Sequence, residues 1–390
     1  MKNIFFIIAL TICIILPTQI QAKSYKVYFQ LKKNHYLPVD LNIDNNVFTI
    51  NNAAEKIKLN HVISQGDSVI VSFNHYESSL IFHQITDKKL TGYWVNYAKS
   101  KNYKIPFYGV SKTKKTKINK DLNKYVGRWE ATFNYDKPTK LIGEFKLEDN
   151  QLRGTFLSET GDYRYLQGDV EKQTLKLSCF DGSHAFLFTA KLKNDTLIGE
   201  FYSGNHYKTE WRAFKNENAT LRNADSLTYI TNKAPISFSL KNTAGKMVNY
   251  SNEDPTDKIT LIQIFGSWCP NCLDETNLLL ELNQEFQDKI QIYGIGFEIE
   301  KTEEEKLKRL ERFKESIAIP YDILLGGDAN KGEATKAFPM LNQIISFPTL
   351  IIIDSKGNVQ KIHTGFSGPA TGEHYITFKE DLYKFIATLD

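Results

Sequence analysis

Two cysteines separated by two residues are the side chains of this sequence best suited to chemistry. Cys269 and Cys272 follow the apolar run 260–265 and open a stretch with the apolar spacing of a helix. The first turn of a helix presents unpaired N–H groups and a partial positive charge, and both stabilise a thiolate. Thiolates attack disulfides, so Cys269 is predicted to attack and Cys272, one helical turn later, to resolve the mixed disulfide.

Two other uses of this cysteine pair fit the sequence less well. Zinc would require two more ligands, whereas His363 and His374 are isolated and no other cysteine is suitably placed. A structural disulfide between residues so close in the chain would close a very short loop and stabilise the fold little. Redox exchange is therefore the favoured interpretation, and no metal or other cofactor is expected.

The remaining cysteines, Cys13 and Cys179, do not form a second pair. Cys13 lies in an N-terminal segment that we expect to be removed, and Cys179 lies in an alternating strand pattern typical of a buried free thiol. An exported protein that needed disulfides for stability would usually carry a larger, even set. This cysteine usage fits redox catalysis better than scaffolding.

Residues 1–22 have the pattern of an export signal. Lys2 supplies the positive start, 4–17 is almost wholly apolar, and the segment closes on the small residue Ala22. The apolar run is too short to span a bilayer. We therefore expect cleavage after Ala22 and a periplasmic location; an uncleaved N-terminal membrane anchor is the alternative.

Length and charge limit the function classes. A chain of 390 residues is long enough for two or three domains. Its 49 Lys and Arg residues and 45 Asp and Glu residues give a formal net charge of +4. Such a balanced charge argues against nucleic acid or an anionic membrane surface as a partner.

Patterning divides the chain after the signal. The segments 23–110 and 123–214 are rich in short alternating runs bounded by turn residues, which predicts two β-rich units. The basic segment 111–122 is interpreted as a solvated linker between them, and the polar segment 215–233 as the linker to the last domain. In 234–390, strands alternate with helices. The fold class is thus an all-β N-terminal region, as barrels or sandwiches, followed by an α/β domain.

The two β-rich units also resemble each other. Residues 69–94 resemble 175–202, and 37–41 echo 141–145, at a nearly constant offset. A constant offset indicates two related β-units.

The C-terminal segment has a clear order of expected elements. We expect strands at 260–265, 290–297, 350–353 and 359–363, and helices at 273–286, 303–316 and 375–389. The residues 354–358 form a hairpin turn between the last two strands. A mixed α/β sheet follows from this order.

Several motifs in this segment resemble the thioredoxin superfamily, and its TlpA/ResA-like exported branch in particular. The active-site motif is Trp-Cys-Pro-Asn-Cys at 268–272, after an apolar strand. The family's cis-proline loop is matched by Phe-Pro-Thr at 347–349, and the glycine after the next strand by Gly-Phe at 365–366. The usual entry to the domain is matched at 234–248. The resemblance covers 234–390 and implies a thioredoxin-like fold there.

This resemblance also implies roles for individual residues. Pro348 should be cis and packed against the cysteines, with the backbone beside it pairing with a substrate chain. Trp268, Phe347 and Gly365 would contact the substrate, and Trp268 would shield the site. For Trp268, core packing alone is the alternative.

One position departs from thioredoxin itself. Gln263 stands where thioredoxin has a buried strand aspartate, and an amide cannot accept a proton at neutral pH. Glu275, three residues after Cys272 on the same helix face, matches an acidic residue of the TlpA/ResA-like branch. We predict that Glu275 has a raised pKa and exchanges the proton of Cys272. An ordinary first-turn glutamate, favoured by the helix dipole, is the alternative.

The resemblance implies a thiol–disulfide oxidoreductase with a redox disulfide between Cys269 and Cys272. Its substrates would be disulfide-bearing exported proteins, or it would act in cytochrome c maturation, with a membrane electron donor to recycle it. A peroxiredoxin-like peroxidase is one alternative, but the position where such enzymes carry Thr or Ser holds Gly266. The other alternative makes 23–214 a module that docks a partner, with the redox domain as its accessory.

Overall fold

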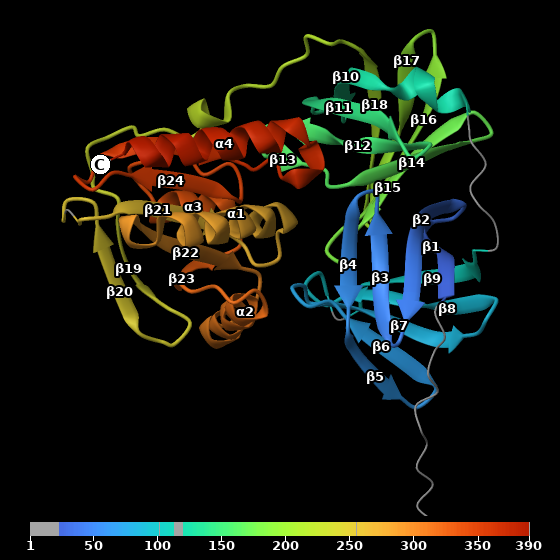
Figure 1. Ribbon diagram of the computed structural model, residues 1–390, viewed down its shortest axis with the longest axis horizontal. Coiled ribbons are helices and arrows are strands. Elements are labelled where there is room, and N and C mark those ends of the chain that lie inside the picture. Colours follow the sequence, from blue (N-terminus) through green and yellow to red (C-terminus); the bar gives the residue numbers. More distant parts are fainter. Residues whose placement is uncertain (1–22, 101, 113–119, 255, 390) are drawn as a thin grey trace, which may run out of the picture.

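The structure, a computed structural model, describes residues 23–100, 102–112, 120–254 and 256–389. The predicted signal segment and most of the predicted basic linker lie outside these residues. Two β-sheets lie beside a domain of strands and helices (Figure 1). No helix within the described ranges is long and apolar enough to cross a membrane.

Nine antiparallel strands form the first sheet, which we name the first barrel. They are β1 (Lys23–Lys32), β2 (His35–Asp44), β3 (Val47–Asn52), β4 (Glu55–Leu59), β5 (His61–Gln65), β6 (Ser68–Ser72), β7 (Ser78–Ile85), β8 (Lys89–Asn96) and β9 (Lys104–Ser111). Strand β1 pairs with both β2 and β9. The two edge strands, β4 and β5, are consecutive in the chain, so the sheet is nearly closed.

The second sheet, the second barrel, follows a short 3₁₀ helix at Lys120–Tyr125. Its strands are β10 (Gly127–Phe133), β11 (Thr139–Glu148), β12 (Gln151–Ser158), β13 (Gly161–Asp162), β14 (Leu166–Glu171), β15 (Thr174–Phe180), β16 (Ala185–Lys193), β17 (Thr196–Ser203) and β18 (Tyr207–Lys215). Because β11 pairs with both β10 and β12, and β10 also pairs with β18, the strands close into a ring. The predicted all-β region is confirmed.

The two barrels repeat one strand order. Strand β1 pairs with the last strand of its sheet, β9, as β10 pairs with β18. The similar sequence segments 69–94 and 175–202 fall on β6–β8 and β15–β17. Gly92 and Gly199 hold equivalent places in these strands. A Cβ at Gly92 would lie 2.1 Å from a carbonyl oxygen of β7, and a Cβ at Gly199 would lie 1.7 Å from a carbonyl oxygen of β16. Equivalent strands approach closely at equivalent glycines.

Side chains of the second barrel complete the core of the first. Phe180, Leu187 and Tyr202 pack into the first barrel's apolar cluster. The Asn52 side chain donates to the Phe180 carbonyl oxygen at 2.8 Å and accepts from the Phe180 N–H at 3.0 Å. The barrels therefore form one packed unit.

The C-terminal domain has a five-stranded mixed sheet and a separate hairpin. The hairpin is β19 (Ser237–Lys241) and β20 (Met247–Ser251), and the sheet, in the order β23-β22-β21-β24-β25, is β23 (Asp322–Asp328), β22 (Ile290–Glu298), β21 (Ile259–Phe265), β24 (Thr349–Ile353) and β25 (Val359–Thr364). The helices are α1 (Pro270–Phe286), α2 (Glu303–Ser316), α3 (Lys331–Ala337) and α4 (Glu373–Thr388), with 3₁₀ turns at Ala224–Ser226, Gln287–Lys289 and Pro369–Thr371. Strand β21 pairs parallel with β22 and antiparallel with β24.

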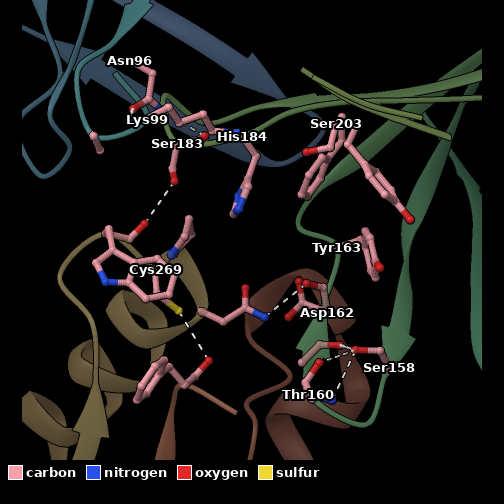
Figure 2. A pocket seen from close by; sticks show the side chains of 18 of the residues that line it. Asn96, Lys99, Ser158, Thr160, Asp162, Tyr163, Ser183, His184, Ser203 and Cys269 are labelled. Carbon is pink, nitrogen blue, oxygen red and sulfur yellow. Dashed lines mark hydrogen bonds between the residues drawn. The ribbon is translucent and has the colours of Figure 1, made fainter. Parts of the chain in front are cut away.

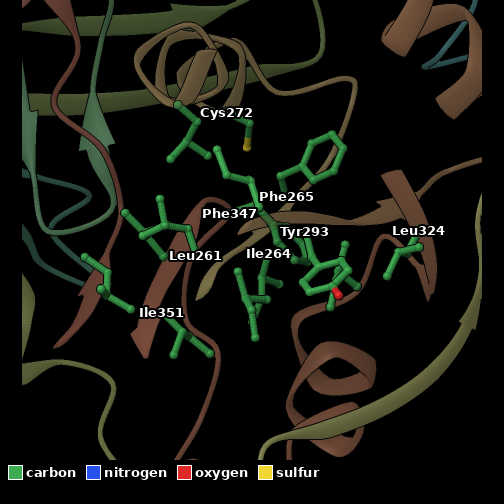
Figure 3. Close-up of a cluster of buried hydrophobic side chains, with 14 of the residues drawn as sticks. Leu261, Ile264, Phe265, Cys272, Tyr293, Leu324, Phe347 and Ile351 are labelled. Carbon is green, nitrogen blue, oxygen red and sulfur yellow. The ribbon is translucent and has the colours of Figure 1, made fainter. Parts of the chain in front are cut away.

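The apolar core of this domain reaches the cysteine pair. Strand β21 is buried along its whole length, and Leu261, Ile264 and Phe265 pack in one cluster with Ile351 of β24. Cys272 belongs to the same cluster (Figure 3). Cys272 is therefore packed in the core of this domain.

Candidate active site

Cys269 occupies the N-cap of helix α1, whose first residue is Pro270. Its Sγ accepts a hydrogen bond from the Cys272 N–H at 3.3 Å and lies 3.6 Å from the Phe347 carbonyl oxygen. Cys269 is 8% exposed and Cys272 0% exposed, and both are free thiols. A helix N-terminus with an N–H aimed at the sulfur favours a thiolate, and only the first sulfur is open to a substrate.

Cys272 has the surroundings of a resolving thiol. Burial raises its pKa, and the neighbouring Cys269 raises it further. Its carbonyl oxygen accepts hydrogen bonds from Gln263 Nε2 at 3.2 Å and from Thr276 Oγ1 at 2.8 Å, so the turn is held rigidly. A buried neutral thiol needs a base before it can act as a nucleophile.

The carboxyl group of Glu275 is buried next to this thiol. Its Oε2 accepts a hydrogen bond from Gln263 Nε2 at 2.9 Å, whereas its Oε1 has no hydrogen-bond partner among the described residues. Burial raises the pKa of Glu275 to about 8, as the sequence predicted. Gln263, which departs from thioredoxin, holds both Glu275 and the backbone of Cys272.

The Phe347–Pro348 peptide bond is cis, which confirms the prediction for this loop. The Phe347 ring stacks on Phe297 with centroids 5.6 Å apart and meets Trp268 edge-on at 6.0 Å. Trp268 Nε1 donates to the Phe297 carbonyl oxygen at 3.0 Å. Trp268 and Phe347 thereby pack against each other, and both line the cavity at Cys269.

Glu298, at the end of β22, supports the segment before the cysteines, and sequence reasoning missed it. Its carboxylate accepts hydrogen bonds from Ser267 N at 2.8 Å and from Ser267 Oγ at 2.7 Å. Arg309 of α2 donates to the Ser267 carbonyl oxygen at 3.2 Å. Burial raises the pKa of Glu298 to about 7. These residues come from different elements, so no sequence spacing signals them.

The second barrel covers part of the proline loop. Ser346 Oγ donates to the Thr160 carbonyl oxygen at 3.1 Å, and Asn271 Nδ2 donates to the Asp162 carbonyl oxygen at 3.1 Å. A Cβ at Gly365, where φ is 78°, would lie 2.8 Å from the Thr160 carbonyl carbon. Gly365 therefore faces the barrel. The substrate contact predicted for Gly365 is not supported, because barrel backbone occupies that place.

A cavity of about 640 Å³ lies where the barrels and the C-terminal domain meet at Cys269. Figure 2 shows Cys269 below His184, with Tyr163 and Ser203 across the cavity. Lining residues include Lys99 of the first barrel, Tyr163, His184, Phe201 and His206 of the second, and Trp268, Cys269 and Phe347 of the C-terminal domain. All three units thus contribute to the surroundings of the reactive sulfur.

Arg164 of the second barrel joins the three units. Its guanidinium donates to Glu55 of the first barrel at 3.1 Å and is ion-paired with Asp274 of α1. Asp181 lies 3.5 Å from the same guanidinium. Arg164 is 3% exposed, and although burial acts to lower its pKa, the surrounding carboxylates raise it overall, so the guanidinium stays charged. The buried cation fixes the start of the active-site helix to both barrels.

The structure keeps the other candidate residues apart from the pair. Cys179 is a buried free thiol in the second barrel's core, as predicted, and burial raises its pKa. His363 contacts Asp225 at 2.7 Å, and His374 contacts Glu144 at 3.1 Å. In the described part of the chain, no group of three or more His, Cys, Asp or Glu side chains is arranged to hold a metal ion.

Comparisons with known proteins extend these observations. Residues 230–362 match the AhpC/TSA family. The thioredoxin-like protein YneN of Bacillus subtilis (strain 168) is 29% identical over 129 residues, which are 33% of this chain and 68% of that protein. A DsbF homologue from Corynebacterium diphtheriae is 20% identical; the match covers 42% of this chain and 92% of that protein, with a TM-score of 0.31. The exposed lipoprotein thioredoxin Etrx1 of Streptococcus pneumoniae is 21% identical; the match covers 39% of this chain and 99% of that protein, with a TM-score of 0.28.

The matched family segment contains the site described above. It includes β21, the cysteine pair at the start of α1 and the cis-proline loop. The C-terminal domain is therefore similar to AhpC/TSA-family and thioredoxin-like proteins, and its cysteine pair and cis-proline loop form the active site of a thiol–disulfide oxidoreductase.

Proposed function

We propose that this protein is an exported thiol–disulfide oxidoreductase that reduces disulfides of exported proteins. The observation that carries the proposal is the asymmetry of the pair: Cys269 is open to the cavity at a helix N-terminus, and Cys272 is buried beside Glu275. Two thiols with these different surroundings suit attack and resolution in turn.

The reaction begins with the reduced pair. The Cys269 thiolate attacks one sulfur of the substrate disulfide, a mixed disulfide forms, and the substrate's other sulfur leaves as a thiolate that takes up a proton. Cys272, after losing its proton, then attacks Cys269 Sγ. The Cys269–Cys272 disulfide forms and the second substrate thiol leaves. The substrate has gained two electrons and two protons, and the enzyme pair has lost two electrons.

Glu275 is proposed as the group that exchanges the proton of Cys272. Its unpaired Oε1 and its pKa of about 8 suit an acceptor that becomes available as the pH rises into the range where thiols ionise. The loss of a proton from Cys272 would be coupled to its gain by the carboxylate.

Recycling of the disulfide requires a dithiol donor, which we propose to be a membrane protein. Export with a cleaved signal, a periplasmic location and service in cytochrome c maturation are parts of the same proposal. They rest on the N-terminal pattern 1–22 and on the family resemblance.

Trapping of substrates tests this proposal. The full chain with Cys272→Ala cannot resolve the mixed disulfide, so exported proteins should accumulate on Cys269 and be released by a reductant. The matched control carries Cys272→Ala and Cys269→Ala together and should capture none. Absence of captured proteins, together with a Cys269 that fails to exchange with any disulfide, would overturn the proposal.

A peroxidase activity is the second candidate, which the match to the AhpC/TSA family keeps in view. Gly266 argues against it, because a Cβ there would lie 2.4 Å from Trp268 Nε1 and leaves no room for a hydroxyl-bearing side chain. Peroxide consumption by the reduced protein at catalytic rates would favour this candidate over disulfide reduction.

A further inference from the structure

The barrels surround the reactive cysteine in a way that a free-standing redox domain would not require. The loop 158–163 lies against Asn271 and the proline loop. On the opposite side, Ser183 Oγ donates to the Trp268 carbonyl oxygen at 3.1 Å (Figure 2). A folded protein surface approaching Cys269 would meet both segments before it reached the sulfur.

The space that remains has the size of a ligand site. Its volume of about 640 Å³ lies within the roughly 300–1,000 Å³ typical of cavities that bind small molecules. Aromatic side chains of the second barrel, including Tyr163, Phe186 and Phe201, line it opposite Cys269. Such a cavity has room for a few residues of extended chain.

Lys99 supplies this cavity with a positive charge below about pH 8, since burial lowers its pKa to about 8. Its Nζ lies 3.1 Å from His206 Nε2 and 5.1 Å from the centroid of the Tyr103 ring. Asp181, the carboxylate whose charge acts on Lys99, is already paired with Arg164. No described carboxylate forms an ion pair with Lys99, so a carboxylate of a bound molecule would find an available cation.

We propose that the two barrels form the substrate-binding wall of the redox site, and that the cavity takes a short flexible peptide segment in which a cysteine lies beside an acidic residue. Lys99 then determines specificity by pairing with that acidic side chain. The inference rests on the proposed function and names its substrate class. The chemical step is unchanged: Cys269 attacks the disulfide sulfur of the segment's cysteine, and the partner sulfur leaves.

Reduction of matched peptide disulfides by the full-length protein tests this inference. The two peptides differ only in Glu or Gln beside the cysteine, and a folded protein with a surface disulfide and oxidised glutathione complete the set. The wild type should reduce the Glu peptide with a kcat/KM about tenfold above that of the Gln peptide, since a charge-assisted bond is at stake. It should reduce the folded protein more slowly than either peptide.

Three variants identify the source of the preference. Lys99→Gln should remove most of the difference between the peptides, chiefly through KM, and Lys99→Arg should restore it. Lys193→Gln, at the exposed far end of β16, is the matched control and should behave as the wild type. Ser203→Trp should fill the cavity and slow both peptides while a small neutral disulfide still reacts with Cys269.

The outcomes separate this inference from the proposed function. Equal rates for both peptides and for the folded protein, unchanged in Lys99→Gln, would overturn the inference and leave the oxidoreductase intact. Faster reduction of oxidised glutathione than of the Glu peptide would overturn the choice of a chain segment as substrate. A wild type that reduces none of these disulfides would overturn the proposed function itself.

Discussion

The two cysteines differ most in what their thiols need in order to react: the helix N-terminus favours a thiolate at Cys269, whereas the buried Cys272 must first pass its proton to a base. Cys272 lies fully buried beside Glu275, whose pKa is raised to about 8, so at neutral pH the carboxyl group is largely protonated. As the pH rises through this value, the carboxylate appears and can accept the proton of Cys272. In this account, the resolution step depends on the ionisation of Glu275.

The first prediction concerns the rate at which Cys272 resolves the mixed disulfide. In the wild type, release of product from a preformed mixed disulfide should accelerate as the pH rises through about 8. Glu275→Gln should slow this step about 10²-fold, the lower range for loss of a general base, and remove the inflection. Single-turnover kinetics measure it, and Glu285→Gln on the exposed face of α1 is the control. An unchanged pH profile in Glu275→Gln would exclude the base role.

The second prediction concerns stability. The pKa of Glu275 is about 8 in the fold, against about 4.3 in an unfolded chain. The folded state therefore binds the proton more tightly, and the group's contribution to stability is lost as the pH rises from about 4 to about 8. At pH 9 the free energy of unfolding of Glu275→Gln should exceed that of the wild type by on the order of 1–4 kcal/mol. At pH 4 the two free energies should differ little. Denaturant titrations at both pH values measure this; a gain of equal size at both would refute it.

Individual residues were predictable where one local motif carries the role. The spacing of Cys269 and Cys272 predicted their roles, whereas the cis bond at Pro348 and the raised pKa of Glu275 were predicted with the help of the family resemblance. Glu298 and Lys99 could not be found in this way, since each reaches the site from an element distant in sequence and only the folded chain brings them there.

Helices and strands with a clear apolar pattern were predicted. The expected helix 303–316, with one apolar face, coincides with α2, and the expected strand 260–265, a continuous apolar run, lies within β21. Helix α1 begins at Pro270, so Cys269 caps it and Cys272 lies in its first turn, as predicted, although the apolar spacing alone marked only 273–286. Helix α3 was missed because only Ala334 is buried in it, and β23 was missed because its apolar run is only three residues long and ends at two glycines.

The third prediction tests the close approach of two neighbouring strands at a glycine, a feature that occurs in each barrel. Gly199→Ala places a Cβ 1.7 Å from a backbone carbonyl oxygen, which only a shift of strands can relieve. The free energy of unfolding should fall by at least about 2 kcal/mol, as for other overpacked sites. Gly66→Asn is the control, because φ there is 57°, which Asn tolerates, and no atom lies within 4 Å. Equal stability of the two variants would show that β16 and β17 do not need this glycine.

At the scale of the whole molecule, the sequence predicted the units but not their contact. The cation that joins them, Arg164, lies in a loop without periodicity, and its partners Glu55 and Asp274 are far away in the chain. Similarity at a constant offset revealed two related β-units, yet nothing in a single sequence shows which faces of separate domains meet. The cavity at Cys269 is therefore a property of the assembled chain.

The fourth prediction tests this assembly. Arg164→Met leaves buried carboxylates without their cation, which should cost about 3–5 kcal/mol and loosen the barrels from the C-terminal domain. Calorimetry should show one unfolding transition for the wild type and two for Arg164→Met. Arg222→Ala removes the exposed pair with Glu159 and should change stability by less than about 1 kcal/mol. A single transition in Arg164→Met at the wild-type temperature would show that the units are not coupled through this residue.

Cys269 attacks and Cys272 resolves, and mass mapping of the mixed disulfide distinguishes these two roles. Full-length Cys272→Ala and Cys269→Ala variants are each mixed with the same peptide disulfide, quenched with acid and digested. Cys272→Ala should accumulate the peptide on Cys269, and Cys269→Ala should accumulate none, because Cys272 and Cys179 are buried. Peptide attached to Cys272 or Cys179, or no adduct on Cys269, would show that the two cysteines do not divide the reaction in this way.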